Sequence, residues 1–248
     1  MNKLSIMGVR IDNKDMNEVM DAIKKKIAGN ERYIIYTPNT EIIMMCQKDK
    51  EFLTAMNSSD INIPDGIGLI YASKIKTHPL KEKVAGYDLS INLLKLADEQ
   101  RLKLFVVGGK PGVAEAAMKN VHLKYPGIII AGTQHGYFKG AHLGEGSHRE
   151  ELEVIENINR AEPHILFVGF GAKKQEQWIE YNKDKINAKI IIGNGGTLDG
   201  LAGNVKRAPE IFIKLGLEEP KRIKRQILLP AFMFKVLFGG KDIVKEIE

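Results

Sequence analysis

The chain has a single cysteine, Cys46, among its 248 residues. One thiol excludes an intramolecular disulfide framework and any Cys-X-X-Cys redox or zinc site. No uncharged apolar run reaches the roughly 18 residues that a membrane-spanning helix needs. The first residues contain Asp12 and Asp15 and lack the apolar stretch of a signal peptide. We therefore expect a cytoplasmic protein that is neither secreted nor inserted into a membrane.

The signature motifs of several enzyme classes are also missing. The chain has no Gly-X-Ser-X-Gly elbow, no Walker-type phosphate loop, no His-Glu-X-X-His and no Gly-X-Gly-X-X-Gly in its first βα unit. It also lacks Asp-X-Asp, the pattern by which many sugar-nucleotide enzymes hold a divalent metal. We expect no metal and no cofactor, so that backbone N–H groups, helix N-termini and Arg or Lys would neutralise any bound phosphate.

Positive charge is in excess and lies mostly at one end of the chain. There are 37 Lys and Arg against 31 Asp and Glu, a net charge of +6. From Lys206 onward, ten basic residues stand against six acidic ones. Such a balance favours anionic partners such as nucleic acid, phosphate esters or acidic lipid.

Short β-rich runs alternate with helical patterns as far as about residue 205, and glycines follow many of the runs. The expected strands are Leu4–Val9, Tyr33–Thr37, Asp60–Pro64, Leu102–Val107, Ile128–Ala131, Ile165–Val168 and Lys189–Ile192. This alternation predicts an α/β fold with a Rossmann-like, mostly parallel sheet covered by helices. Ligands of such sheets bind at the carboxyl ends of the strands. We expect a catalytic domain over residues 1–204, with no core strand beyond it.

Residues 205–248 are expected to form a basic amphipathic C-terminal helical appendage. A helix is predicted over Pro209–Leu217, and a second over Lys221–Leu237 with Pro230 inside it. The second combines four bases in the five positions 221–225 with phenylalanines at 232, 234 and 238. This pattern favours an element that lies in the interface of an anionic membrane. The alternative is a helix docked on its own domain or on a partner subunit.

Two polar turns follow neighbouring expected strands. Asp65 lies between Pro64 and Gly66, where a carboxylate could meet a substrate that approaches the glycine backbone. The alternative is that Asp65 caps the next helix, since Asp is a preferred capping residue. Thr37 and Asn39 end the previous strand in the same way, with the same alternative. Two such turns at one edge of a sheet make a site more probable than either turn alone.

A glycine-rich turn, Gly193-Asn194-Gly195-Gly196-Thr197, ends the last expected strand and precedes Asp199. Bare amides beside a helix start suit a diphosphate, and the acid could meet ribose hydroxyls. Gln175 and Glu176 open another helix, either as sugar-binding groups or as a solvated first turn.

Three histidines lie in or before a Gly- and His-rich segment, residues 140–147, that is expected to be an exposed loop. His142 and His148 are interpreted as solvated loop residues rather than metal ligands. His135 stands at a strand end, where a site residue and a packing residue are equally expected.

Eight motifs occur in a characteristic order. They are Thr37-Pro38-Asn39-Thr40-Glu41, Pro64-Asp65-Gly66-Ile67-Gly68, Gly86-Tyr87-Asp88-Leu89, Val107-Gly108-Gly109-Lys110-Pro111-Gly112, His135-Gly136-Tyr137-Phe138, Lys174-Gln175-Glu176, Gly195-Gly196-Thr197-Leu198-Asp199 and Lys206-Arg207-Ala208-Pro209. In this order they resemble the WecG/TagA/CpsF family, glycosyltransferase family 26, over nearly the whole chain. The chain departs from the family in lacking a short segment between Glu218 and Glu219.

The resemblance implies an inverting, metal-independent glycosyltransferase at the cytoplasmic face of the cell membrane. The chain looks most like the TagA branch, which moves N-acetylmannosamine from its UDP sugar to undecaprenyl-diphosphate-linked N-acetylglucosamine in teichoic acid synthesis. The implied partners are thus a UDP-sugar donor, a polyprenyl-diphosphate-linked sugar acceptor and an anionic membrane surface. No nucleic acid is expected, and a homo-oligomer is possible.

The family's functional residues can be carried over motif by motif. Asp65 is implied as the catalytic base, with Thr37 and Gln175 around the sugars. The implied nucleotide and substrate site comprises Asn39, Gly108, Gly109, Tyr137, Gly195, Gly196, Asp199 and Arg207. Arg222 and Arg225 are implied to face the diphosphates of donor or acceptor.

Other functions stay open. The donor could be UDP-N-acetylmannosaminuronic acid or another UDP-hexose. More distant alternatives are a Rossmann-type oxidoreductase, disfavoured by the missing Gly-X-Gly-X-X-Gly, and a non-catalytic protein that binds anionic lipid.

Overall fold

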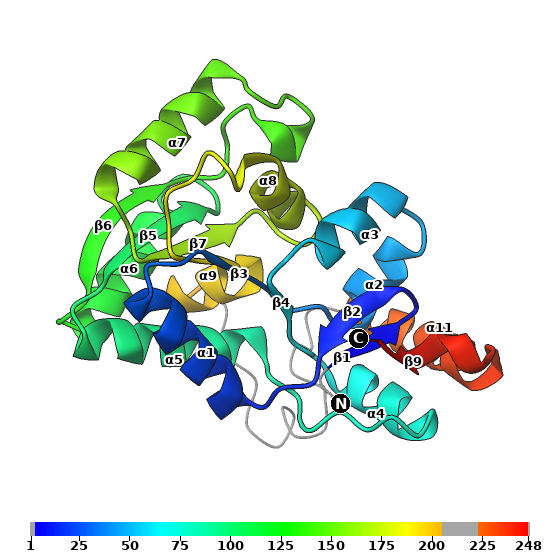
Figure 1. The fold of residues 1–248 in the computed structure, drawn as a ribbon. Coiled ribbons are helices and arrows are strands. Elements are labelled where there is room, and N and C mark those ends of the chain that lie inside the picture. Colours follow the sequence, from blue (N-terminus) through cyan, green and yellow to red (C-terminus); the bar gives the residue numbers. More distant parts are fainter. Residues whose placement is uncertain (1–2, 205–222, 248) are drawn as a thin grey trace. The chain divides into compact units, whose positions relative to one another are not determined.

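The computed structural model describes residues 3–204 and 223–247 (Figure 1). Its described residues form two compact units. The first unit holds residues 3–19, 36–85 and 223–247, and the second holds residues 20–35 and 86–204. This division differs from the expected boundary between residues 204 and 205, because the described end of the chain is grouped with its beginning.

The larger sheet has six strands in the order β4-β3-β8-β7-β5-β6. They are β4 (Ile61–Asn62), β3 (Tyr33–Tyr36), β8 (Ile190–Gly193), β7 (Ile165–Gly169), β5 (Lys103–Gly108) and β6 (Ile129–Gln134). The pairs β3–β8, β8–β7, β7–β5 and β5–β6 are all parallel. The central strands are buried apolar runs, as a sheet covered on both faces requires. The predicted α/β fold is confirmed.

Helices cover both faces of this sheet in the second unit. They are α1 (Met16–Ala28), α5 (Gly86–Glu99), α6 (Val113–Lys124), α7 (Arg149–Ala161), α8 (Lys174–Asn182) and α9 (Gly195–Leu201), with a short 3₁₀ turn η1 (Ala141–Leu143). Figure 1 shows α7 and α8 on one side of the strands and α5, α6 and α9 on the other. Because the paired strands are parallel, they all end at the same edge of the sheet, where the connections to the following helices begin.

The first unit contains a three-stranded antiparallel sheet in the order β2-β1-β9. The hairpin β1 (Lys3–Ile6) and β2 (Val9–Asp12) replaces the single strand predicted over Leu4–Val9, so that prediction is wrong. The chain reverses at Met7 (φ 50°) and Gly8 (φ 84°). A tight hairpin turn needs positive φ at both positions, and Met rarely adopts it, which hides this turn from sequence patterns.

The described end of the chain belongs to the core of the first unit. The strand β9 (Val244–Glu246) pairs with β1, so the expectation of no strand after residue 204 is wrong. The predicted helix with an internal proline is confirmed as α11 (Ile223–Phe238), which packs on α2 (Thr40–Cys46) and α4 (Ile67–Ile75). Phe232, Val236 and Val244 are fully buried. The remaining elements are α3 (Lys50–Asn57) and the 3₁₀ turn η2 (Lys241–Ile243).

Two expectations fall wholly or partly outside this description. The helix predicted over Pro209–Leu217 lies outside the described residues, as does the junction of Glu218 and Glu219. Within residues 3–204 and 223–247, no helix is long and apolar enough to cross a membrane.

Candidate active site

Three predicted site residues come together in the first unit. The Ile63 N–H donates to the carbonyl oxygen of Tyr36 at 3.0 Å, and the Asp65 N–H donates to that of Pro38 at 2.9 Å. These two bonds continue a parallel ladder past the strand ends. Because Pro38 lies between Thr37 and Asn39, the ladder places both residues beside the Asp65 turn.

The capping alternative is wrong for Asp65 and right for Asn39. The helix α4 has Gly66 as its N-cap, without any side-chain capping bond. Asp65 is therefore not the N-cap of the helix that follows it, and the residue is half-buried in this turn. By contrast, the Asn39 side-chain oxygen accepts a hydrogen bond from the Ile42 N–H at 3.0 Å and caps α2.

The glycines that follow Asp65 allow close packing. Gly66 has φ 140°, a region that L side chains rarely adopt. A Cβ on Gly68 would lie 2.5 Å from Thr40 Cγ2 and 2.8 Å from Leu229 Cδ1. The helix α11 thus contacts the first turn of α4, three residues beyond Asp65 in sequence.

The glycines Gly108 and Gly109 end β5 in the second unit. Gly108 pairs in register with Gly169 of β7, and a Cβ on Gly108 would lie 2.4 Å from the Gly169 carbonyl oxygen. The Gly109 N–H donates to that same oxygen at 3.0 Å, and the Gly136 N–H donates to the Gly109 oxygen at 2.9 Å. Close packing of the strand ends is a sufficient physical reason for the two glycines, and a role in nucleotide binding stays a prediction.

The turn between β8 and α9 is tied to its neighbours. The Asn194 N–H donates to the Val168 carbonyl oxygen at 2.6 Å, and Ser90 Oγ donates to Asn194 Oδ1 at 3.0 Å. The Asn194 side-chain nitrogen is buried and has no hydrogen-bond partner among the described residues. Such a group is costly unless a ligand or water satisfies it. Asn194 is therefore a candidate binding residue that the sequence reasoning did not single out.

Gly195, Gly196 and Asp199 lie on α9 next to this turn. Gly196 is exposed, and Gly195 and Asp199 are partly exposed. The Gly195 N–H, which was expected to face a diphosphate, donates instead to Gln175 Oε1 at 3.1 Å. The structure thus brings Gly195 and Gln175 into direct contact.

Gln175 and Glu176 are buried at the beginning of α8, with 7% and 2% of their surface exposed. The alternative of a solvated first turn is therefore wrong. Gln175 Nε2 donates to Glu176 Oε1 at 2.8 Å, and the Lys173 N–H donates to Glu176 Oε2 at 2.7 Å. Burial raises the pKa of the Glu176 carboxyl from 4.5 to about 7, against the opposing effect of its hydrogen bonds with Gln175 and the backbone.

This raised pKa predicts a pH-dependent stability. Between pH 4.5 and about 7 the folded chain holds a proton on Glu176 that the unfolded chain has lost. The free energy of unfolding should therefore fall as the pH rises through this window, by up to about 3 kcal/mol, and level off above it. Urea unfolding at about pH 5 and about pH 8 should show this slope in the wild type and not in Glu176→Gln. Equal slopes in both proteins would contradict the prediction.

The segment over residues 140–147 is held against α7, so the expectation of an exposed loop is only partly right. Glu151 is fully buried and accepts hydrogen bonds from the N–H groups of Ala141 (2.8 Å) and Ser147 (2.6 Å). His142 is buried too, so its interpretation as a solvated residue is wrong. The His142 ring stacks on the ring of Phe170, with the two centroids 4.3 Å apart. Burial lowers the pKa of the imidazole.

The other residues of this region lie nearer the surface. Tyr137 is 64% exposed, and its N–H donates to His135 Nδ1 at 3.2 Å. His148 caps α7 through its bond from the Glu150 N–H. The structure therefore gives both histidines local backbone partners, while Tyr137 remains exposed.

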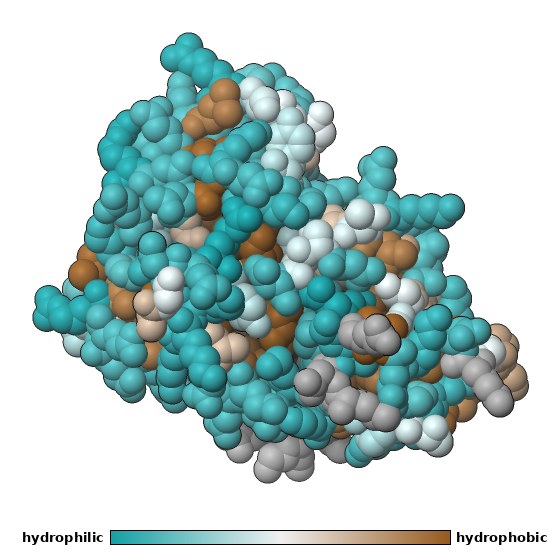
Figure 2. Space-filling view, in the orientation of Figure 1, coloured by the Kyte–Doolittle hydropathy of each residue, from teal (hydrophilic) through white to brown (hydrophobic). Residues whose placement is uncertain are grey.

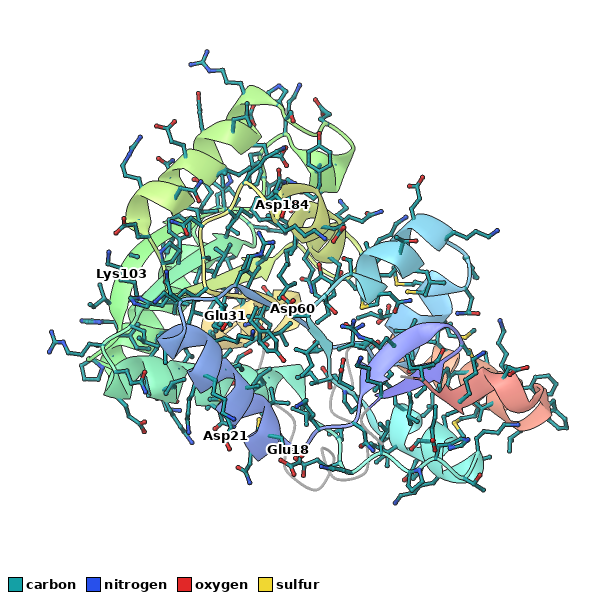
Figure 3. The ribbon with its side chains drawn as sticks, in the orientation of Figure 1. Glu18, Asp21, Glu31, Asp60, Lys103 and Asp184 are labelled. Carbon is teal, nitrogen blue, oxygen red and sulfur yellow. The ribbon has the colours of Figure 1, made fainter. Side chains whose placement is uncertain are left out.

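The acidic side chains labelled in Figure 3 come from several parts of the chain. Figure 3 labels Glu18 and Asp21 on α1 and Asp184 after α8. Asp184 pairs with Arg32 at 3.0 Å. Among the described residues, no three His, Cys, Asp or Glu side chains are placed to hold a metal ion.

The three predicted arginines cannot be placed in the site. Arg207 and Arg222 lie outside the described residues. Arg225 falls within α11, but its side chain is not described. Their roles stay predictions.

Comparison with known proteins gives the family. The model of the family described as "Glycosyl transferase WecG/TagA/CpsF family" matches residues 4–242. The chain belongs to this family. It is a glycosyltransferase, as the resemblance implied.

Two curated relatives come from Staphylococcus aureus, strains MRSA252 and NCTC 8325. Each is 32% identical over 252 aligned positions, which cover 98% of this chain and 95% of the relative. Both are named N-acetylglucosaminyldiphosphoundecaprenol N-acetyl-beta-D-mannosaminyltransferase. The similarity therefore extends over both units of this WecG/TagA/CpsF glycosyltransferase.

Proposed function

We propose that this chain transfers N-acetylmannosamine from UDP-N-acetylmannosamine to undecaprenyl-diphosphate-linked N-acetylglucosamine, a step of teichoic acid linkage-unit synthesis. The observation that carries the proposal is the Asp65 turn. There Asp65, which is not the N-cap of α4, stands beside Thr37 and Asn39 at the end of a parallel ladder. The names of the two staphylococcal relatives support the choice of sugars.

Asp65 is proposed as the general base. Its carboxylate would take the proton of the acceptor hydroxyl while that oxygen attacks the anomeric carbon of the donor. The bond from the anomeric carbon to the UDP oxygen breaks in the same displacement, so the configuration is inverted. The base needs no strong pKa shift, because the hydroxyl becomes acidic only in the transition state. Thr37 and Gln175 would position the sugars.

The second unit is proposed to bind the nucleotide. Its parallel strands β5, β7 and β8 end at one edge, where α/β sheets bind their ligands. The proposed contacts are Tyr137, Gly196, Asp199 and Asn194 Nδ2, which has no hydrogen-bond partner among the described residues. Gly108, Gly109 and Gly195 would allow close approach. Backbone N–H groups and the arginines at 207, 222 and 225 would stabilise the diphosphate of the departing UDP in place of a metal.

The position of Arg225 along α11 supports its proposed role in binding a diphosphate. Leu229 of α11 contacts Gly68. Arg225 precedes Leu229 by four residues, close to one helical turn. A basic residue one turn away from a contact with the Asp65 segment is consistent with a role in diphosphate binding.

We further propose that α11 binds the cytoplasmic face of the membrane peripherally. This helix has a buried apolar side, with Phe232 and Val236, and an exposed apolar stripe. The exposed stripe consists of Phe234, Leu237 and Phe238, with 63%, 54% and 75% of their surface exposed. Figure 2 shows apolar side chains at the surface over this helix. Aromatic and aliphatic side chains beside basic residues favour binding to an anionic bilayer interface. Self-association of the stripe in a homo-oligomer is the alternative.

The transfer proposal is tested by a donor panel. Each reaction contains the protein, a short-chain lipid diphosphate that carries N-acetylglucosamine, and one donor. The donors are UDP-N-acetylmannosamine, its uronic acid analogue, UDP-N-acetylglucosamine and UDP-glucose. We expect a product with one added N-acetylmannosamine by mass, and free UDP in equal amount. An acceptor without its diphosphate is the control. A product only with another sugar, or none at all, would overturn the proposed substrates.

A further inference from the structure

Glu176 is a buried carboxyl group for which the transfer step described above has no use. It lies in the first turn of α8, and only 2% of its surface is exposed. A carboxyl group in the interior costs free energy unless hydrogen bonds compensate for lost water. Its surroundings therefore indicate what it does.

The carboxyl group connects two loops through Gln175. Its oxygens accept hydrogen bonds from Gln175 Nε2 at 2.8 Å and from the Lys173 N–H at 2.7 Å. At the other end of the amide, Gln175 Oε1 accepts a hydrogen bond from the Gly195 N–H at 3.1 Å. A chain of bonds thus runs from the loop after β7 to the first residue of α9.

Two glycines leave room for this amide. A Cβ on Gly193 would lie 2.8 Å from Gln175 Nε2 and 3.2 Å from Glu176 Oε1. A Cβ on Gly195 would lie 2.9 Å from Gln175 Oε1. The Gln175 side chain is therefore held against bare backbone on both sides, and few other rotamers fit.

The shape of the pocket cannot orient the amide by itself, because its oxygen and NH₂ ends are nearly the same size. The hydrogen-bond partners must do so. Above its pKa of about 7, Glu176 is a carboxylate, which accepts but does not donate, so it attracts the NH₂ end. The oxygen end is then directed to the Gly195 N–H.

We propose that Glu176 is a positioning residue that sets the orientation of the Gln175 amide and thereby holds Gly195 at the start of α9. The proposal rests on the proposed function only in assigning Gln175 and Gly195 to the substrate site. In Glu176→Gln one oxygen is replaced by NH₂, so that one of the two donors, at Gln175 or Lys173, loses its acceptor.

The first test is a double-mutant cycle on transfer. At about pH 8, where Glu176 is ionised, Glu176→Gln should lower turnover about tenfold, since one hydrogen bond to a charged group is lost. In a Gln175→Ala background the same change should cost less than about twofold, because residues that act through one another are not additive. Glu180→Gln, on the same helix and ion-paired with Lys183 at 2.9 Å, is the matched control. It should leave turnover unchanged in both backgrounds.

The second test needs no substrate. Hydrogen exchange of the Gly195 amide, followed by NMR, should be about tenfold faster in Glu176→Gln than in the wild type and unchanged in Glu180→Gln. Should Glu176→Gln fail to fold, Glu176→Asp replaces it: its carboxylate is one methylene too short to reach Gln175 Nε2, so the Gly195 amide should show the same acceleration.

The two readouts separate this proposal from the proposed function. Additive losses in the cycle, or unchanged exchange at Gly195, would overturn the positioning role. If the wild type transfers no sugar, the proposed function fails, and the exchange of the Gly195 amide alone decides on Glu176.

Discussion

Asp65→Asn is expected to lower the turnover of sugar transfer by about 10²–10⁴-fold, the usual contribution of a general base. The amide can hydrogen-bond to the acceptor hydroxyl but cannot take its proton. The hydrogen bond to Pro38 should survive, because it uses the Asp65 backbone N–H rather than its carboxylate. Affinity for UDP, measured by calorimetry, should stay within about twofold of the wild type.

Asp60→Asn is the matched control for this variant. Asp60 is an exposed acid just before β4, five residues from Asp65 (Figure 3). The two substitutions remove the same charge from the same unit. Turnover that falls equally in both would point to a general electrostatic effect, and full turnover in Asp65→Asn would remove Asp65 from the catalytic role.

The sheet was predictable because its signal is local. The strands β5, β7 and β8 are apolar runs that end in glycine, and each is followed by a helical pattern. Burial on both faces requires such runs, and parallel strands require helices between them. The turn at Asp65 was found for the same reason, since a carboxylate next to Gly66 at a strand end is visible in the sequence alone.

The contacts that involve distant segments were not predictable in this way. The strand β9 has three residues, and its pairing with β1 joins opposite ends of the chain. The stacking of His142 on Phe170 depends on how a loop returns to the sheet. In both cases the local sequence looks like an exposed segment, and only tertiary packing shows otherwise.

Glu176 shows the same limit for a polar residue. Acids in a first helical turn are common and usually solvated, because they favour the positive end of the helix dipole. Nothing in Lys-Gln-Glu distinguishes a solvated acid from a buried one. The distinguishing signal lies at Gly193 and Gly195, where the missing Cβ atoms leave space for the Gln175 amide.

The packing of α11 changes how membrane binding has to be tested. If residues 1–204 formed the whole catalytic domain, as the sequence predicts, removing all residues after Asn204 would leave the α/β core folded. The deletion would take away Phe232, Val236 and Val244, which are fully buried, and the strand β9. Loss of each such side chain costs about 1.5–3 kcal/mol of burial, so the first unit should unfold. Substitutions confined to the exposed stripe avoid this effect.

Replacing Phe234, Leu237 and Phe238 together with serine is therefore expected to weaken binding to phosphatidylglycerol vesicles by on the order of 10–100-fold. The stripe is exposed, so the stability of the unit should change little even though the variant loses the contact between the rings of Phe234 and Phe238, whose centroids lie 4.6 Å apart. Serine at the exposed Leu123 and Leu152 of the second unit provides the control, which should bind as the wild type does.

The dependence of vesicle binding on salt concentration distinguishes electrostatic attraction from apolar burial. Each base near the surface contributes about 1 kcal/mol, and this attraction is screened at high ionic strength, whereas apolar burial is not. The wild type should therefore keep a salt-resistant fraction of its vesicle binding, and the serine variant should lose that fraction while retaining the salt-sensitive part. On a water-soluble acceptor the variant should transfer sugar at the wild-type rate, because the stripe is proposed to bind lipid and not substrate. Unchanged vesicle binding, combined with a smaller oligomer in sedimentation, would instead assign the stripe to contacts between copies of the chain.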